Sequence, residues 1–111
     1  MKFKLVITCL LFGLYYGFAQ NSGSIKGKVI DKNSKQALPY VNIVVKDNDK
    51  IVTGGVTKDD GSFLVSALAE KKYTVEIQFI GYITLTNTVD LTKDAQYNLG
   101  VMAIQEDVTE L

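Results

Sequence analysis

The chain has 111 residues, 47% of them hydrophobic, and its 12 basic residues, all lysine, balance 12 acidic residues. This length allows one small domain at most, and a near-neutral surface does not attract nucleic acid by releasing counterions, so we expect no nucleic-acid partner. Because the chain lacks histidine and arginine, it also lacks the Ser-His-Asp and Cys-His constellations of hydrolases, the usual zinc ligand sets and the bidentate recognition of phosphate by arginine.

Residues 1–19 have the layout of a secretory signal peptide. A basic start over residues 1–4 precedes an apolar run over residues 5–18, and the small residues Gly17 and Ala19 suit a cleavage site. The apolar run is shorter than the roughly 20 residues that a transmembrane helix needs. We therefore expect the segment to be removed on export and no permanent transmembrane span to remain.

The only cysteine, Cys9, lies inside this apolar run. A lipid-modified cysteine should end the run after a small residue, whereas Thr8 precedes Cys9 and apolar residues follow it. We therefore interpret Cys9 as a small hydrophobic residue, and the mature chain contains no disulfide.

The rest of the chain divides into a flexible lead-in at residues 20–24, a folded region at 25–104 and a tail at 105–111. Short segments with alternating apolar and polar residues, or with β-branched runs, predict strands in the folded region. The expected strands cover residues 25–31, 40–46, 51–57, 62–66, 73–79, 82–89 and 96–103.

The alternation also predicts which side chains face the core. In the first segment Lys26 and Lys28 should face solvent. The opposite side of that segment should carry Ile25, Gly27 and Val29. In the second segment and in the last three, the residues expected together on one side are Val41, Ile43, Val45, Tyr73, Val75, Ile77, Phe79, Ile83, Leu85, Val89, Tyr97, Leu99 and Val101.

Turn signals separate the segments. Residues 47–50, Asp-Asn-Asp-Lys, predict a turn before the third segment. Asp60-Gly61 predicts a hairpin that joins the third and fourth segments, with Val56, Phe63 and Val65 on one face, because glycine enters the positive-φ region without steric cost.

Glycine and proline predict three further local features. Gly54-Gly55 indicates a bulge or the close approach of another backbone, and Pro39 suits the start of an edge strand. Residues 68–72 could form one helical turn at most, since they are too few for more than a connection. Together, seven short strands without a helix-period segment predict an all-β, seven-stranded antiparallel β-sandwich.

Four blocks of sequence, at residues 27–31, 37–45, 55–63 and 79–82, follow one another in the order seen in carboxypeptidase regulatory-like domains, which the chain resembles over nearly all of its folded region. The resemblance implies a transthyretin-like sandwich and assigns structural motif positions. These positions are Gly27, Asp31, Pro39, Thr57, Asp60, Gly61, Phe63, Gly81 and Tyr82. The family usually has aspartate directly after the threonine, where this chain has Lys58, so any hydrogen bond of that aspartate falls to Asp59 or is missing.

In Bacteroidota, such domains commonly follow the signal peptide of TonB-dependent outer-membrane receptors. The resemblance therefore implies a non-enzymatic, exported accessory or interaction domain without a cofactor, in the periplasm or on the periplasmic face of the outer membrane. Its partners would be envelope proteins or the remainder of a receptor, and residues 105–111 look like the connector towards a plug domain and barrel. The alternative is a stand-alone secreted or periplasmic binding module, with glycans as its ligand class.

No peptidase activity follows from the family name, because these domains resemble an accessory module of carboxypeptidases and not their zinc-binding domain. Hydroxyisourate hydrolase is built on the transthyretin fold, but its site relies on histidine and arginine, which this chain lacks. We therefore expect no enzyme activity and no catalytic residues.

Two groups of side chains are the remaining candidates for a ligand site. Asp47, Asp49, Asp59 and Asp60 lie in two turns and are weak calcium candidates, since loop carboxylates bind calcium but are also common in turns for local hydrogen bonding. Tyr40, Tyr82 and Tyr97 are candidates for a sugar-stacking platform. Tyrosine in a sandwich is more often half-buried core, and we favour that role, above all for Tyr82.

Overall fold

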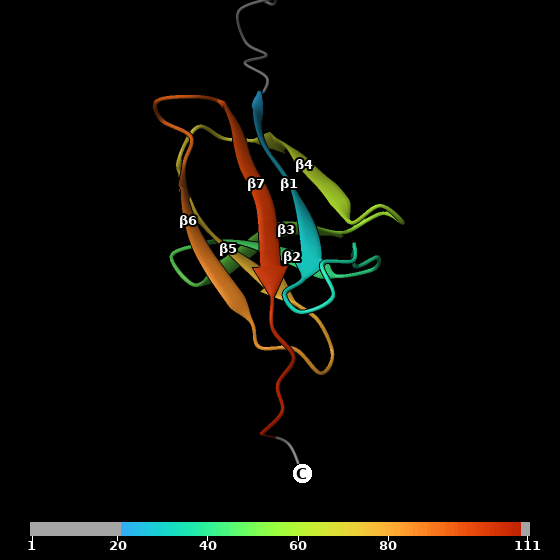
Figure 1. Ribbon diagram of the computed structural model, residues 1–111. Helices are drawn as coiled ribbons and strands as arrows, with labels where there is room; N and C mark the ends of the chain where they lie inside the picture. Colours follow the sequence, from blue (N-terminus) through green and yellow to red (C-terminus); the bar gives the residue numbers. More distant parts are fainter. Residues whose placement is uncertain (1–20, 110–111) are drawn as a thin grey trace, which may run out of the picture.

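Seven strands fold into two facing sheets in the computed structural model, which describes residues 21–109 (Figure 1). No helix occurs within these residues, so the expected turn of helix at 68–72 is absent. The strands are β1 (Gly23–Asp31), β2 (Asn42–Asp47), β3 (Lys50–Val56), β4 (Ser62–Leu68), β5 (Lys72–Gln78), β6 (Leu85–Asp90) and β7 (Gln96–Ile104). The all-β prediction with seven strands is therefore confirmed.

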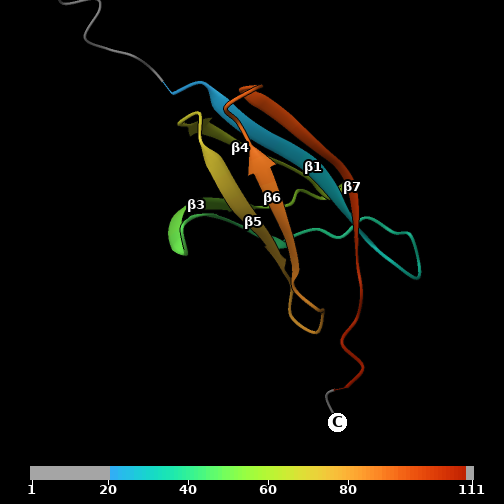
Figure 2. The same cartoon turned by 90° about the vertical axis from the view of Figure 1, so that its left-hand side faces the viewer.

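One sheet has three strands in the order β4-β1-β7, and the other has four in the order β3-β2-β5-β6. Figure 2 shows the two sheets as separate layers. All neighbouring strands are antiparallel except β1 and β7, which pair in parallel. The predicted purely antiparallel sandwich is wrong on this point: each connection reverses the chain, so odd-numbered strands run the same way, and two of them are neighbours here.

The turn between β2 and β3 forms as predicted. Asn48 and Asp49 both have positive φ, at 49° and 66°, and Asp47 lies opposite Lys50. Two central residues with positive φ are the signature of the tight hairpin turn whose twist matches that of the strands.

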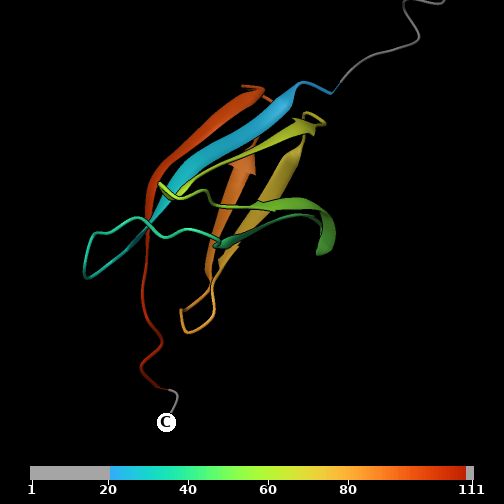
Figure 3. The same ribbon diagram turned by 90° about the vertical axis from the view of Figure 1, so that its right-hand side faces the viewer.

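The hairpin predicted around Asp60-Gly61 is wrong, although its turn is present. Gly61 has φ of 79° and donates its N–H to the Lys58 carbonyl at 2.8 Å. Beyond the turn, however, β4 pairs with β1 in the other sheet, and the chain crosses between the layers (Figure 3). Val56 on β3 is consequently 55% exposed, whereas Phe63 on β4 is buried.

The core lies between the sheets and contains the inward residues of every strand except β3. The predicted inner faces of β1, β2 and β5 are confirmed. The buried residues of the core are Ile25, Val29, Val41, Ile43, Val45, Phe63, Val65, Leu68, Tyr73, Val75, Ile77, Val89, Leu91, Met102 and Ile104.

The predicted face of the last strand is wrong beyond Leu99. Gly100 has φ of 74°, its N–H is bonded to the Asn98 side chain at 2.9 Å, and the register with β1 shifts at this point. This bulge turns Val101 out to solvent and brings Met102 into the core.

Three smaller expectations also change. Ile83 is exposed and precedes β6, because β6 begins only at Leu85. Pro39 lies in a turn before β2, which is an inner strand and not an edge. The lead-in ends earlier than expected, since β1 begins at Gly23.

The Gly54-Gly55 prediction holds for the first glycine. A Cβ at Gly54 would lie 2.5 Å from the Ile43 carbonyl oxygen, so the two backbones approach closely there. The register shift in this strand pair falls between Val45 and Lys46 of β2 instead of opposite the glycines.

The predicted signal peptide at residues 1–19 lies outside the described residues. Within residues 21–109, no helix has the length and hydropathy required to cross a membrane.

Candidate functional site

Thr57 holds the segment before β2 in place. Its side chain is 1% exposed, accepts a hydrogen bond from the Val41 N–H at 2.9 Å and donates one to the Leu38 carbonyl at 2.6 Å. Its backbone N–H donates to the Val41 carbonyl, and its carbonyl accepts from the Tyr40 N–H, both at 3.0 Å. The polar groups of this threonine are thus occupied by the fold.

Asp31 and Tyr82, 51 residues apart in the chain, form a second bracing contact. The Tyr82 hydroxyl donates to the Asp31 carboxylate at 2.5 Å, and the same carboxylate accepts the N–H groups of Asn33 and Ser34. The Tyr82 hydrogen bond, followed by these backbone amides, lowers the pKa of Asp31, and the bond to Asp31 raises the pKa of Tyr82 to about 12. The pair ties the end of β1 to the β5–β6 loop.

Two glycines of the predicted motif make room for neighbours. A Cβ at Gly61 would lie 2.5 Å from the Val29 carbonyl oxygen, and one at Gly27 would lie 2.9 Å from the Phe63 ring. Gly81, with φ of 82°, allows the chain to turn back so that the Tyr82 N–H reaches the Phe79 carbonyl. These motif residues shape the fold and present no reactive group to solvent.

The calcium candidates do not come together. The turn with Asp47 and Asp49 precedes β3, and the turn with Asp59 and Asp60 follows it, so the length of the strand, roughly 20 Å, separates them. Asp47 pairs with Lys71 at 3.4 Å. Within residues 21–109, no three histidine, cysteine or acidic side chains form a group that could hold a metal ion.

Asp60, and not Asp59, makes the local hydrogen bonds of the second turn. Its carboxylate accepts the N–H of Ser62 at 3.0 Å and the hydroxyl of Ser62 at 2.6 Å, and these bonds, the hydroxyl first, lower the pKa of Asp60. Lys58 contributes backbone hydrogen bonds alone, so its side chain is not needed for the turn.

The three candidate tyrosines do not form a platform. Tyr97 lies opposite Ile25 near the start of β1, whereas Tyr82 is bonded to Asp31 at its end, about 20 Å away. Tyr82 packs against the core as predicted, and its ring centroid lies 5.5 Å from that of Phe79. Tyr40 is 68% exposed beside Thr57, so the half-buried core role favoured for it is wrong, and within residues 21–109 no aromatic ring packs against it.

The outer face of the β4-β1-β7 sheet is the most distinctive surface of the described chain. Register places Leu64 and Asn98 on either side of Lys26, and Ser62 and Val101 on either side of Lys28. We call this surface the lysine face. It consists of Ser24, Lys26, Lys28, Ser62, Leu64, Ser66, Gln96, Asn98 and Val101, with Asp94 at its edge beside Gln96.

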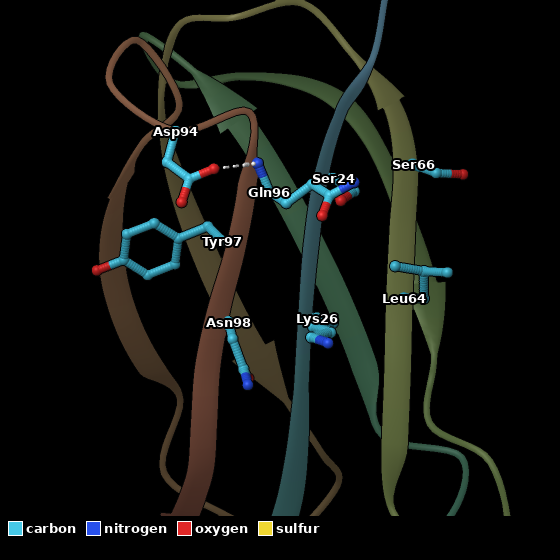
Figure 4. Close-up of a pocket in the computed structure, with 8 residues that line it drawn as sticks. All are labelled: Ser24, Lys26, Leu64, Ser66, Asp94, Gln96, Tyr97 and Asn98. Carbon is cyan, nitrogen blue, oxygen red and sulfur yellow. Dashed lines mark hydrogen bonds between the residues drawn. The ribbon is translucent and has the colours of Figure 1, made fainter.

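Two shallow hollows follow one another along the lysine face. One of about 550 Å³ surrounds Lys26, and another of about 320 Å³ extends past Lys28; Lys26 and Asn98 line both. Figure 4 shows Lys26 projecting from β1 between the side chains of β4 and β7, while the Tyr97 ring extends from β7 away from β4. The hollow around Lys26 is also lined by Asp94 and Tyr97, so it carries both charges, whereas the hollow that extends past Lys28 is lined by both lysines and by no acidic residue. The second hollow can therefore bind a ligand through cationic and uncharged polar groups.

The sequence predicted the two outward lysines but not the surface that they belong to. Alternation in β1 was the available signal. The walls of the hollows come from β4 and β7, whose pairing with β1 no local pattern revealed.

A second exposed surface follows the free edge of β3. Ile51, Val52 and Val56 are all exposed there, and Gly54-Gly55 leaves the backbone uncovered by side chains. Such an edge can accept an extended segment as an added strand.

Comparison with known proteins shows one family. The chain matches the CarboxypepD_reg-like domain family over residues 25–111. Among curated proteins, none gives a significant match.

Solved structures share the fold at low sequence identity. The group B streptococcus pilus 2b backbone protein is 21% identical with a TM-score of 0.60, over 78% of this chain and 42% of that one. The major pilin subunit BcpA of Bacillus cereus is 16% identical with a TM-score of 0.62, over 78% of this chain and 31% of that one. The 5-hydroxyisourate hydrolase of Klebsiella pneumoniae is 9% identical with a TM-score of 0.54, over 73% and 90%. The chain thus spans less than half of the two pilus proteins, and these likenesses show the fold alone.

Proposed function

The chain belongs to the CarboxypepD_reg-like domain family, and from this premise we propose that it is a non-enzymatic accessory domain of an exported protein. In the finer form of the proposal, it is the periplasmic N-terminal module of, or a piece of, a TonB-dependent outer-membrane uptake receptor in a Bacteroidota bacterium. It acts there by contacting other envelope proteins or the remainder of the receptor.

The observation that supports this proposal is that the polar motif residues are engaged in hydrogen bonds within the fold. Thr57, Asp31 and Tyr82 direct their polar groups into hydrogen bonds that hold loops to strands. The domain therefore presents two exposed surfaces to other molecules, the lysine face and the β3 edge. We infer that these surfaces bind other proteins and do not catalyse a reaction.

The absence of histidine and arginine from the whole chain supports a non-enzymatic role. The acid-base and nucleophile sets of common hydrolases need a histidine or an equivalent activated base. The likeness to a hydrolase supports no activity here, because at 9% identity it concerns the fold.

Export is tested by expressing the full chain with a C-terminal tag in a Bacteroidota host and fractionating the cells. We expect the tagged protein in the periplasmic or outer-membrane fraction, with an intact mass that corresponds to a start at Gln20. A cytoplasmic protein that keeps residues 1–19 would refute the proposal.

The receptor context is tested by reading the genomic DNA past the codon for Leu111. A frame that continues into a plug domain and barrel supports the receptor module. A stop codon refutes it and favours the stand-alone secreted or periplasmic binding module.

A further inference from the structure

We propose that the lysine face binds an extended acidic peptide segment of another envelope protein, with alternating carboxylates paired to Lys26 and Lys28. This inference rests on the proposed function, because it specifies the partner of a contact domain. It commits to one surface and one ligand chemistry.

The two lysines provide the charge. They are two residues apart on β1, so both side chains leave the same face of the sheet at a spacing of about 6.6 Å. Neither forms an ion pair with a residue in the described part of the chain. Lys28 interacts electrostatically with the carboxylate of Asp60, which is hydrogen-bonded to Ser62 and forms no ion pair with the lysine.

The neighbouring strands provide the walls. Leu64 on β4 lies beside Lys26, and Val101 on β7 lies beside Lys28. Both apolar side chains are exposed, so a bound segment would cover them and exclude water from the adjacent ion pairs. Asn98, which lines both hollows, offers an amide to the backbone of the segment.

An extended peptide matches this spacing. Its side chains point to one face at every second residue, about 6.6 to 6.8 Å apart, which places carboxylates at alternate positions opposite the two lysines. A second copy of the chain is a poor occupant, because face-to-face contact would bring four lysines together. A glycan would meet a single aromatic ring, that of Tyr97 at the rim of the hollow around Lys26, and this ring extends away from β4 (Figure 4).

Binding is measured by fluorescence anisotropy with a labelled ten-residue peptide of alternating glutamate and serine, using the full chain purified from the host that exports it. The comparison peptide alternates glutamine and serine. We expect weak binding of the acidic peptide, no binding of the neutral one, and loss of affinity as salt rises. Because one exposed ion pair contributes up to about fivefold in affinity, the double variant Lys26→Gln/Lys28→Gln should bind about tenfold more weakly.

The matched control is Lys50→Gln/Lys72→Gln, which removes the same charge from the four-stranded sheet. Circular dichroism confirms that each variant is folded. Equal binding by wild type and Lys26→Gln/Lys28→Gln, or equal weakening in the control variant, would overturn the proposal. So would absence of peptide binding at millimolar concentration, or preferential binding of polygalacturonate, and either result leaves the accessory function standing if export has been shown.

Discussion

Replacing Thr57 by valine tests whether the hydroxyl of this buried residue holds the β2 entry together. Valine has nearly the same shape, so the substitution leaves packing intact but removes the acceptor of the Val41 N–H and the donor to the Leu38 carbonyl. A buried polar group left without a partner costs about 1–3 kcal/mol. The Leu38 contact is only partly buried, and the added methyl group gains some apolar burial.

We therefore expect Thr57→Val to lower the free energy of unfolding by about 2–3 kcal/mol. For a domain whose total stability is about 5–15 kcal/mol, this is a large fraction. Equilibrium unfolding in urea measures it, and at a typical slope of about 1–2 kcal/mol per molar the midpoint should fall by roughly 1–2 M.

Two control variants make the result specific. Thr57→Ser keeps the hydroxyl and loses one methyl group, so it should cost only about 1 kcal/mol. Thr88→Val changes an exposed threonine on β6 and should stay within about 0.5 kcal/mol of wild type. If Thr57→Val is as stable as wild type, or if Thr57→Ser is the less stable of the two Thr57 variants, the hydrogen-bonding argument is wrong.

Three further predictions follow from the contacts described above. The pKa of Asp31 is lowered in the folded state, so its contribution to stability is present above the ordinary value of 3.8 and is lost as pH falls through the folded pKa. The pKa of Tyr82 is raised from 10.0 to about 12, so its contribution is present below pH 10 and is lost as pH rises towards 12. Tyr82→Phe should flatten both slopes in urea unfolding across pH, and unchanged slopes would contradict the pairing. Gly61→Ala should lower the urea-derived free energy of unfolding more than Gly81→Ala. Both glycines have positive φ, which costs an alanine about 1–2 kcal/mol, but only at Gly61 would the added Cβ lie 2.5 Å from a backbone carbonyl oxygen. Equal losses would exclude that contact as a cause. Calcium should leave the melting temperature unchanged relative to chelator, because β3 separates the two aspartate turns, and a calcium-dependent rise would disprove this separation as the deciding factor.

The alternation of apolar and polar residues predicted the strands because each residue type reflects whether that position faces the core or solvent. In β1, β2 and β5 the alternation is complete, and the apolar side chains that these strands were expected to place inside are buried. In β7 a single bulge at Gly100 reverses the alternation, so Val101 and Met102 exchange the faces expected of them. A single residue in the left-handed conformation therefore reversed the faces predicted for the residues after it, although the strand itself was predicted correctly.

Pairing between strands was not accessible in the same way. Asp60-Gly61 has the local chemistry of a hairpin and does form a tight turn, yet the next strand is held by the Val29 N–H of β1 at the Gly61 carbonyl. The choice between β3 and β1 as neighbour of β4 depends on burying Phe63 and Val65 against the other sheet. That is a property of the assembled core and not of the turn.

For the candidate site, too, the sequence predicted individual residues but not the contacts between residues distant in the chain. Asp31 and Tyr82 were singled out separately, but nothing in either block indicated that they bond to each other. Likewise, the outward direction of Lys26 and Lys28 was predicted, whereas Leu64 and Val101 beside them come from strands distant in sequence.

The parallel ladder between β1 and β7 has a mechanical consequence. The chain enters β1 at one end of the molecule and leaves β7 at the other (Figure 1), so tension applied through residues 23 and 104 pulls the two strands past each other lengthwise. Under such shear, the bonds along the ladder share the load and must fail together, whereas a hairpin pulled at its open end yields one bond at a time. The parallel ladder should therefore resist extension in this direction more strongly than a hairpin of the same length pulled from its open end.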